Sequence, residues 1–476
     1  MPFEIDAFHL PGLDPRDVDR WERRGYGDDV VLRFPVLDAG VWREVLRRLG
    51  TARERALAGR PVGDIVAAVD AAAARLADND DPLRRTAESA LPAITGYSLP
   101  MIRLTLDRMA ADWRAPVLDR LLTCELGDPR VLDAFTAMPV PRSTVTRRVR
   151  ALGPDLAFHI FAGNVPGVAV TAVVRALLVK AAVAGKLASG EPLLTVLFAR
   201  ALASVDSELG DCLALTYWPG GHEPLETVAF DAADAVIVYG GEEVVAAVRA
   251  RTRTEQRLVV YGPRLSCGVI GADALTRGNG PALAYEVARA VAIFDQQGCV
   301  SPHVVYVERG GEISPAELAR ALAEAMAGIQ ETLPRGRISA AEAAAIHDAR
   351  ATAEFRALSG EPVELFASRD TAFTVIYEEN APFTVSCLNR VVRVVPVDAV
   401  DDVERELRPV ARYLQTVGVA GVSGARLTSL AERLARAGAS RITTFENVPW
   451  PPAEWHHDGG EPLRSLLRWV DLEYGD

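Results

Sequence analysis

The chain has 476 residues and a formal net charge of −12, from 52 basic and 64 acidic residues. This length predicts about two or three domains, and 49% hydrophobic residues is ordinary for a globular protein with sizeable cores. Nucleic acids and anionic membranes bind basic surfaces, so the acidic balance argues against both as partners.

The chain shows no sign of export or membrane insertion. Its longest apolar stretch, residues 165–183, is interrupted by Arg175 and Lys180, and a membrane span needs about 20 apolar residues. The first residues lack the positive and apolar regions of a signal peptide. The five cysteines (Cys124, Cys212, Cys267, Cys299 and Cys387) form no zinc or disulfide pattern. We therefore expect a cytoplasmic protein without a metal site.

Residues 1–150 are expected to form a mostly helical N-terminal region that packs on the next domain. Apolar residues recur at helical spacing in segments 41–57 and 61–77. Residues 142–150 are locally basic. A solvated face is the ordinary explanation, and a docking site for phosphate groups is the alternative.

From about residue 155, short apolar runs alternate with helical segments. We expect strands at 157–162, 212–217, 235–239 and 257–261, and helices at 168–183, 192–205, 242–251 and 281–294. This alternation predicts βαβ units and a parallel sheet, and we assign residues 151–292 to one domain.

A second α/β region is assigned to residues 293–445. It is expected to contain extended segments at 304–308, 383–397 and 417–422, and helices at 313–329, 403–414 and 427–437. Ser314 and Pro315 form a typical helix start. Residues 446–476 form a C-terminal tail that should end on a short helix at 463–472.

Cys299 is the most informative residue, because it lies among polar neighbours where a helix ends. A thiolate is a good nucleophile, and such positions can lower a cysteine pKa. Local context leaves two roles open, a catalytic nucleophile and a spare core thiol.

Three further positions could bind or stabilise anions at the ends of strands. Asn164 lies in a strand-to-helix turn and could offer its amide to an oxyanion. Lys186 is one of only two lysines and could bind a ribose or a phosphate. Gly240 and Gly241 open a helix whose free N–H groups could face an anion. Each of these signals also has an ordinary structural explanation.

One histidine cluster, His456-His457-Asp458, lies near the C-terminus. An interface or folding role is the simpler explanation, and proton transfer is the alternative.

Three segments carry a family resemblance. They are residues 294–302 around Cys299, residues 413–418 (Tyr-Leu-Gln-Thr-Val-Gly), and residues 455–460 (Trp-His-His-Asp-Gly-Gly) with 467–473. Together they resemble the LuxC-type acyl-CoA reductases, a branch of the aldehyde dehydrogenase superfamily. The resemblance runs from about residue 155 to the end and is loose before it. It implies an α/β fold, with a Rossmann-like cofactor domain, an α/β catalytic domain and the nucleophilic cysteine between them.

The resemblance also implies roles for individual residues. Cys299 would be the acyl-accepting nucleophile, and Asn164 would form the oxyanion hole with the Cys299 N–H. Lys186 would bind the adenosine ribose, and Gly240 and Gly241 would lie over the pyrophosphate.

Two positions depart from the pattern of the superfamily. Tyr261 occupies the place of the glutamate that activates water in hydrolytic relatives, so an acyl-enzyme should resist hydrolysis. Ser189 stands where NAD-preferring relatives often have a glutamate. A serine would not repel a ribose 2′-phosphate, which favours NADPH, with NADH as the alternative.

The resemblance therefore implies NADPH-dependent reduction of an acyl thioester to an aldehyde through a covalent acyl-cysteine. The donor would be an acyl-CoA or an acyl-carrier protein, an acyl-activating synthetase could be a partner, and the chain would form a homo-oligomer. One alternative is a CoA-acylating or ordinary aldehyde dehydrogenase working in the oxidative direction. Another is an acyl-holding subunit of a multi-enzyme complex.

Overall fold

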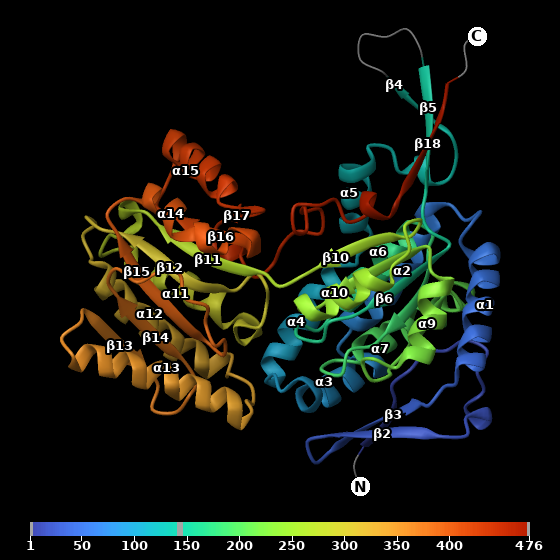
Figure 1. The fold of residues 1–476 in the computed structure, drawn as a ribbon, viewed down its shortest axis with the longest axis horizontal. Helices are drawn as coiled ribbons and strands as arrows, with labels where there is room; N and C mark the ends of the chain where they lie inside the picture. The colour runs from blue at the N-terminus through green and yellow to red at the C-terminus, as the bar shows by residue number, and fades with distance from the viewer. Residues whose placement is uncertain (1–2, 140–145, 474–476) are drawn as a thin grey trace.

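The computed structural model describes residues 3–139 and 146–473. Two lobes, each built around a parallel sheet, lie side by side, and a narrow arm projects from one of them (Figure 1). One lobe contains the N-terminal helices and a five-stranded sheet, and the other contains a seven-stranded sheet. The α/β fold expected from the sequence is confirmed.

The N-terminal region begins with a three-stranded sheet that the helical expectation did not include. Its strands are β1 (Phe3–Asp6), β2 (Trp21–Tyr26) and β3 (Val30–Pro35). Five helices follow: α1 (Ala39–Ala56), α2 (Val62–Ala77), α3 (Pro82–Thr95), α4 (Leu99–Asp112) and α5 (Ala115–Leu126). Asp38 caps α1 by accepting a hydrogen bond from the Val41 N–H at 2.8 Å. The helices predicted at 41–57 and 61–77 correspond to α1 and α2.

The first parallel sheet follows the predicted alternation of strands and helices. Its strands are β6 (Leu156–Ile160), β7 (Ala182–Lys186), β8 (Leu213–Thr216), β9 (Ala235–Tyr239) and β10 (Arg257–Tyr261). Its helices are α6 (Val168–Leu178), α7 (Leu194–Val205), α8 (Ser207–Gly210), α9 (Glu223–Ala232) and α10 (Glu242–Arg251). The helix expected to reach residue 183 ends at Leu178, because the chain turns at Lys180 (φ 63°) and then enters β7.

The strand order of this sheet, β10-β9-β6-β7-β8, reverses between β6 and β9. In doubly wound sheets, ligands bind beyond the carboxyl ends of the strands at such a reversal, because the flanking loops diverge there. Asn164 follows β6 and Gly240 follows β9. The topology therefore places both residues at the edge where a ligand is expected.

The second sheet has the order β13-β14-β15-β12-β11-β16-β17. Its strands are β11 (Leu265–Ile270), β12 (Pro302–Glu308), β13 (Val363–Ala367), β14 (Thr374–Glu378), β15 (Val391–Val397), β16 (Leu414–Ala420) and β17 (Arg441–Thr443). Its helices are α11 (Gly280–Ala292), α12 (Pro315–Thr332), α13 (Ala340–Leu358), α14 (Val403–Leu407) and α15 (Gly424–Arg436). All pairings within it are parallel except that of β13 with β14.

The predicted domain boundary at residues 292/293 does not match this sheet. Strand β11 pairs with β12 and β16, so the second unit already includes Leu265. Only residues 262–264 separate β11 from β10, which belongs to the first sheet. Because β10 and β11 follow each other so closely, the sequence shows no sign of a domain boundary between them. Only their pairing partners show that they belong to two different sheets.

Several predicted elements of the second lobe change in length or type. Ser314 caps α12 as expected, since its hydroxyl accepts a hydrogen bond from the Glu317 N–H. The helix expected at 403–414 is a short α14 followed by a 3-10 helix at Arg408–Tyr413. Strand β15 begins only at Val391, and α13, β13 and β14 were not predicted.

The C-terminal end forms a strand instead of the predicted helix. A short 3-10 helix at Arg464–Leu466 leads into β18 (Arg468–Leu472). This strand pairs antiparallel with β5 (Thr146–Leu152), which also pairs with β4 (Thr136–Pro139), and the three strands build the projecting arm (Figure 1).

The arm also contains part of the basic run at residues 142–150. Residues 142–145 lie outside the described residues, and Arg147 forms an ion pair with Asp471, whose Oδ1 lies 2.5 Å from Nη2. In the described parts of the chain, no helix combines the length and the apolar character needed to cross a bilayer.

Candidate active site

The loop that carries Cys299 has an unusual main chain. It follows a 3-10 helix at Ile293–Gln296, in which Phe294, Asp295 and Gln296 have φ values of 55°, 46° and 66°. Residues other than glycine rarely adopt this left-handed conformation, which costs about 1–3 kcal/mol per residue. Surrounding contacts must therefore hold the loop in place.

A second left-handed run, at residues 388–390, supplies these contacts. The Asp295 carboxylate accepts a hydrogen bond from Arg390 Nε at 2.9 Å, and Arg390 Nη2 lies 2.7 Å from the same oxygen. Both side chains are almost fully buried. The Gln296 side chain accepts a hydrogen bond from the Val391 N–H at 3.0 Å and donates one to its carbonyl at 2.9 Å. The loops at residues 294–296 and 388–390 therefore stabilise each other, and their contacts hold the main chain that leads into Cys299.

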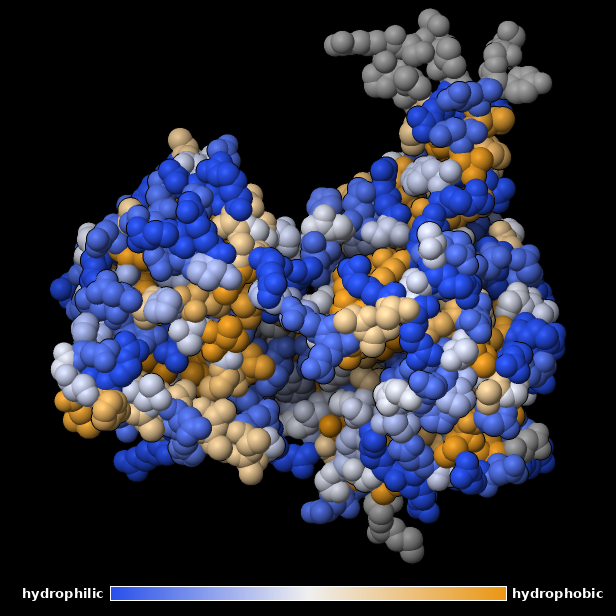
Figure 2. All heavy atoms as spheres, viewed as in Figure 1, coloured by the Kyte–Doolittle hydropathy of each residue, from blue (hydrophilic) through white to orange (hydrophobic). Residues whose placement is uncertain are grey.

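Cys299 is partly buried and lines a cavity of about 550 Å³. The groove between the two lobes is visible in Figure 2, with hydrophobic side chains along its walls. The apolar lining includes Met109, Trp113, Leu118, Leu121, Val174 and Trp450. A cavity of this size, mostly apolar and with a few polar groups, suits an elongated apolar ligand with one reactive end.

Asn164 is held directly against the Cys299 loop. Its side-chain Nδ2 donates a hydrogen bond to the Gln297 carbonyl at 2.9 Å. The Tyr97 hydroxyl lies 2.6 Å from the Asn164 carbonyl oxygen and 3.1 Å from that of Phe294. The structure thus brings Asn164 and Cys299 together in one cavity.

Two residues from distant segments join Cys299 in this cavity. Gln415 comes from β16, and Asp458 comes from the C-terminal tail. Gln415 Nε2 donates to Asp458 Oδ1 at 2.5 Å, and Arg264 Nε lies 2.9 Å from Asp458 Oδ2. Residues 294–302, 413–418 and 455–460, which carry much of the family resemblance, therefore meet at one place.

The electrostatic environment of Cys299 contradicts the expectation of a lowered pKa. Burial, reinforced by the nearby Asp458 carboxylate, raises the pKa of the thiol to about 11. A hydrogen bond from Gln415 and the charge of Arg264 act in the opposite direction but do not compensate. At neutral pH the thiol is therefore protonated, and a reaction at its sulfur requires a proton acceptor.

We expect alkylation of Cys299 by iodoacetamide to accelerate about tenfold per pH unit from neutral pH and to level off near pH 11, because only the thiolate reacts. Labelling is followed by mass spectrometry, with the Cys299→Ala protein as the blank for the other cysteines. A plateau below pH 8 would contradict the raised pKa.

An aromatic stack forms one wall of the cavity. Its rings follow the order Tyr239, Tyr261, His457 and Trp455, with centroid separations of 4.5, 4.3 and 4.7 Å. Burial raises the pKa of Tyr261, and burial with the nearby positive charges of two arginines lowers the pKa of His457 to about 3. Both side chains are therefore uncharged at neutral pH.

The residues predicted to bind a cofactor lie along the carboxyl edge of the first sheet. Lys186 ends β7, and its Nζ lies 3.7 Å from Glu226 Oε1. Burial lowers the pKa of Lys186, and Glu226 acts against this shift. Ser189 is exposed, and its carbonyl accepts a hydrogen bond from the Tyr26 hydroxyl at 2.9 Å.

The glycine turn at the same edge opens onto the Cys299 cavity. Gly240 follows β9, and Gly241 precedes α10 as an N-cap without a side-chain hydrogen bond. A Cβ atom at Gly240 would lie 3.1 Å from the Val244 side chain, whereas the space at Gly241 is open. The free N–H groups of α10 are thus accessible to an anion at the cavity.

The family model described as "Acyl-CoA reductase (LuxC)" matches residues 57–469, most of the chain. The chain belongs to this family. As a LuxC-family protein, it is an oxidoreductase that acts on an acyl or aldehyde group.

Curated relatives of this LuxC-family chain are named long-chain acyl-protein thioester reductases. The long-chain acyl-protein thioester reductase of Aliivibrio fischeri is 26% identical over 405 residues, which cover 82% of this chain and 78% of the relative. The reductase of the same name from Vibrio harveyi is 24% identical over 401 residues, with the same coverage.

Solved structures with the same fold are aldehyde dehydrogenases. Aldehyde dehydrogenase 21 of Physcomitrella patens superposes with a TM-score of 0.74 at 13% identity, covering 99% of this chain and 98% of that one. An NAD-dependent aldehyde dehydrogenase of Sinorhizobium meliloti gives the same TM-score at 14% identity, covering 99% and 95%. These similarities confirm the aldehyde-dehydrogenase-like fold of the LuxC-family chain.

The sequence assigns no role to Gln415 or Arg264, and it leaves the cluster of Asp458 with His456 and His457 open between an interface or folding role and proton transfer. Gln415 and Asp458 lie inside segments that also carry the family resemblance. Their polar side chains within these segments were the available signal, but nothing in the sequence showed that they meet Cys299.

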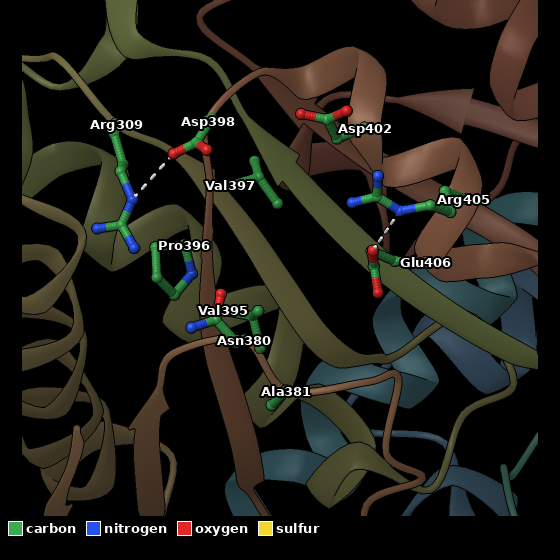
Figure 3. A pocket seen from close by; sticks show the side chains of 10 residues that line it. All are labelled: Arg309, Asn380, Ala381, Val395, Pro396, Val397, Asp398, Asp402, Arg405 and Glu406. Atoms are coloured by element: carbon green, nitrogen blue, oxygen red, sulfur yellow. Dashed lines mark hydrogen bonds and ion pairs between the residues drawn. The ribbon is translucent and has the colours of Figure 1, made fainter. Parts of the chain in front are cut away.

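A second hollow, of about 300 Å³, lies beyond the carboxyl ends of β12 and β15 (Figure 3). Cys299 precedes β12, so the hollow and Cys299 lie at opposite ends of this strand. Its arginines face carboxylates, with Arg309 Nε 3.3 Å from Asp398 Oδ1 and Arg405 Nε 3.1 Å from Glu406 Oε1. Its lining includes no cysteine, serine or histidine, and we assign it no activity. The described ranges contain no group of three or more His, Cys, Asp or Glu side chains placed to bind a metal ion.

Proposed function

We propose that the protein reduces an acyl thioester to an aldehyde with NADPH, through a thioester formed on Cys299. The observation that carries this proposal is the cavity, which joins a cysteine, an apolar lining and a glycine turn at the cofactor edge of the sheet. The family, acyl-CoA reductases, supports the direction of the reaction.

In the first half-reaction, Cys299 attacks the thioester carbonyl and the donor thiol leaves. The Asn164 amide uses one N–H on the Gln297 carbonyl, and its second N–H is free to stabilise the tetrahedral oxyanion together with the Cys299 N–H. The apolar lining holds the acyl chain and excludes water from the reacting carbon.

The residues at the carboxyl edge fit a nicotinamide dinucleotide. Lys186 and Ser189 would hold the adenosine ribose, and Gly240 with Gly241 would let the pyrophosphate approach the N–H groups of α10. When bound, the nicotinamide cofactor supplies the hydride that reduces the acyl group. Asn164 stabilises the oxygen during this step, and Cys299 leaves as the aldehyde forms.

Tyr261 favours reduction over hydrolysis. It occupies the place where the resemblance predicts a water-activating glutamate, and its buried phenol is protonated at neutral pH. His457 beside it is a weak base because its pKa is lowered to about 3. Neither side chain can efficiently activate water for attack on the acyl-enzyme.

The donor and the partners are proposed from the relatives. The relatives named long-chain acyl-protein thioester reductases support a protein-bound acyl donor, with acyl-CoA as the alternative. An acyl-activating synthetase would supply such a donor. A homo-oligomer and a cytoplasmic location are part of the same proposal.

The decisive assay incubates the protein with NADPH and a series of acyl-CoAs or acyl-carrier proteins. Loss of reduced cofactor is followed by absorbance, and aldehyde is trapped with a hydrazine. We expect one aldehyde for each NADPH consumed. If the protein forms acid from aldehyde and NADP⁺ but does not reduce any thioester, the result would favour an aldehyde dehydrogenase. Binding of acyl groups without any NADPH turnover would favour an acyl-holding subunit.

We expect Ser189→Glu to lower the ratio of kcat/KM for NADPH to that for NADH by about tenfold, or roughly 1.4 kcal/mol, because a carboxylate would repel the 2′-phosphate. Steady-state kinetics with both cofactors measure this ratio. The control is Ser207→Glu, at an exposed serine on the opposite edge of the sheet. An unchanged ratio in Ser189→Glu would place the 2′-phosphate elsewhere.

A further inference from the structure

Asp458 is a carboxylate of the C-terminal tail that reaches the Cys299 cavity. Its side chain is only 7% exposed, and it has one hydrogen bond and one ion pair. Oδ1 accepts a hydrogen bond from Gln415, and Oδ2 pairs with Arg264. A buried carboxylate held by a hydrogen bond and an ion pair has a fixed position.

A tight turn of the main chain holds the Asp458 carboxylate in its position at the cavity. Asp458 has a φ of 56°, and Gly459 has a φ of 83°. The N–H of Gly459 donates to the His456 carbonyl at 3.0 Å, and the N–H of Gly460 donates to that of His457 at 3.1 Å. The stack of His457 on Tyr261 anchors the turn to the first lobe. The left-handed conformation of an aspartate costs free energy, so the contacts of the neighbouring residues must hold Asp458 in it.

Gln415 places Asp458 close to the sulfur of Cys299. Its side-chain amide has two N–H groups, one directed at Asp458 Oδ1 and the other available to Cys299, whose thiolate it stabilises. Asp458 and Cys299 line the same cavity, and the carboxylate is close enough for its charge to raise the pKa of the thiol. A proton can pass between them through one water molecule or after a small movement of the thiol.

We propose that Asp458 accepts the thiol proton of Cys299 when the sulfur attacks the thioester, and returns it to the departing thiol. The S–H bond of Cys299 breaks as its S–C bond to the acyl group forms. The C–S bond of the donor then breaks, and its sulfur takes the proton from Asp458. No proton or electron is gained or lost. The inference rests on the proposed function, because it requires a thioester donor.

The charges around the sulfur support this exchange. Arg264 faces both Asp458 and Cys299, so it can neutralise a negative charge on either group. Arg441 also lies near Cys299, with its Nη1 and Nη2 donating to the carbonyls of residues 448 and 447. When the Cys299 proton moves to Asp458, a negative charge moves from the carboxylate to the sulfur. The positive charges nearby stabilise that charge on either group.

A carboxylate with this role need not hydrolyse the acyl-enzyme. The Cys299 thiol, with a pKa of about 11, is a much stronger acid than bulk water. Removing a proton from water is therefore far less favourable for Asp458 than removing it from the thiol.

The test compares two rates in Asp458→Asn and in the wild-type protein. The first is acyl transfer, measured as release of free CoA from an acyl-CoA in a single turnover without cofactor, and we expect it to fall about 10²-fold or more. The second is alkylation of Cys299 by iodoacetamide at neutral pH, which we expect to accelerate, because loss of the negative charge favours the thiolate. Glu473→Gln, at an exposed carboxylate of the same tail, should change neither rate.

The direction of the two changes separates the roles of Asp458. A purely structural role would slow both reactions, and a purely electrostatic role would accelerate both, and either outcome overturns the proposal. Asp458→Ala provides a second variant, in which added formate should restore acyl transfer if a base is missing. Absence of such rescue in a folded Asp458→Ala protein would also overturn it.

Failure of the proposed function gives a different result. If the wild-type protein releases no thiol from any acyl-CoA or acyl-carrier protein, the thioester donor is wrong and this inference falls with it. If the wild-type protein releases thiol and Asp458→Asn does so at the same rate, only the role of Asp458 is wrong.

Discussion

Replacing Cys299 by alanine is expected to abolish aldehyde formation from every thioester, with a loss of at least about 10⁴-fold in kcat/KM. Without the sulfur no acyl-enzyme forms, and the cavity offers no other thiol, since Cys267 and Cys212 are fully buried in hydrophobic cores. The measurement is single-turnover release of CoA, followed by aldehyde trapping with NADPH present.

Cys124→Ala is the matched control, because it removes an exposed thiol on α5 that does not line the cavity. It should retain full activity. Both variants should unfold within about 1 kcal/mol of the wild-type protein. Aldehyde formation that persists in Cys299→Ala would disprove the covalent mechanism.

Breaking the buried ion pair between Arg390 and Asp295 is expected to produce the largest loss of stability. In Arg390→Met, the free energy of unfolding should fall by about 3–5 kcal/mol, because a carboxylate that is 6% exposed is left without its cation. Arg390 also donates to the Gln330 side chain and to the Leu333 carbonyl, and these bonds are lost as well. Urea unfolding followed by fluorescence measures the change.

Two controls test this interpretation. Arg16→Met breaks an ion pair whose arginine is 89% exposed, and it should leave the urea unfolding midpoint unchanged within error. The double variant Asp295→Asn with Arg390→Met removes the buried charge and should recover part of the loss. A small loss in Arg390→Met would show that other contacts hold the Cys299 loop.

The sequence alone predicted the elements whose signals are local. The Ser314 hydroxyl and the following proline start α12 through contacts within one helical turn. Strands β9 and β10 and helix α10 fall at the residues predicted for them, because continuous apolar runs and glycine turns mark their limits. The parallel sheets follow from the alternation of such segments.

Elements that depend on distant partners were not predictable in this way. Residues 463–472 have a pattern compatible with a helix, yet β18 forms because Trp469 pairs opposite Ala151 in β5. Strand β11 belongs to the second sheet because it lies between β12 and β16. In both cases the pairing partner, rather than local propensity, decides the structure.

The candidate site divides in the same way. The sequence by itself identified Cys299, Asn164, Lys186 and the Gly240 turn as chemistry-bearing residues, because their types and neighbours differ from those of a core. Only the tertiary structure brought Gln415 and Asp458, more than a hundred positions away in the chain, to the Cys299 sulfur. It also decided the sign of the thiol pKa shift, since burial and a carboxylate from another segment act through space and leave no trace in the local sequence.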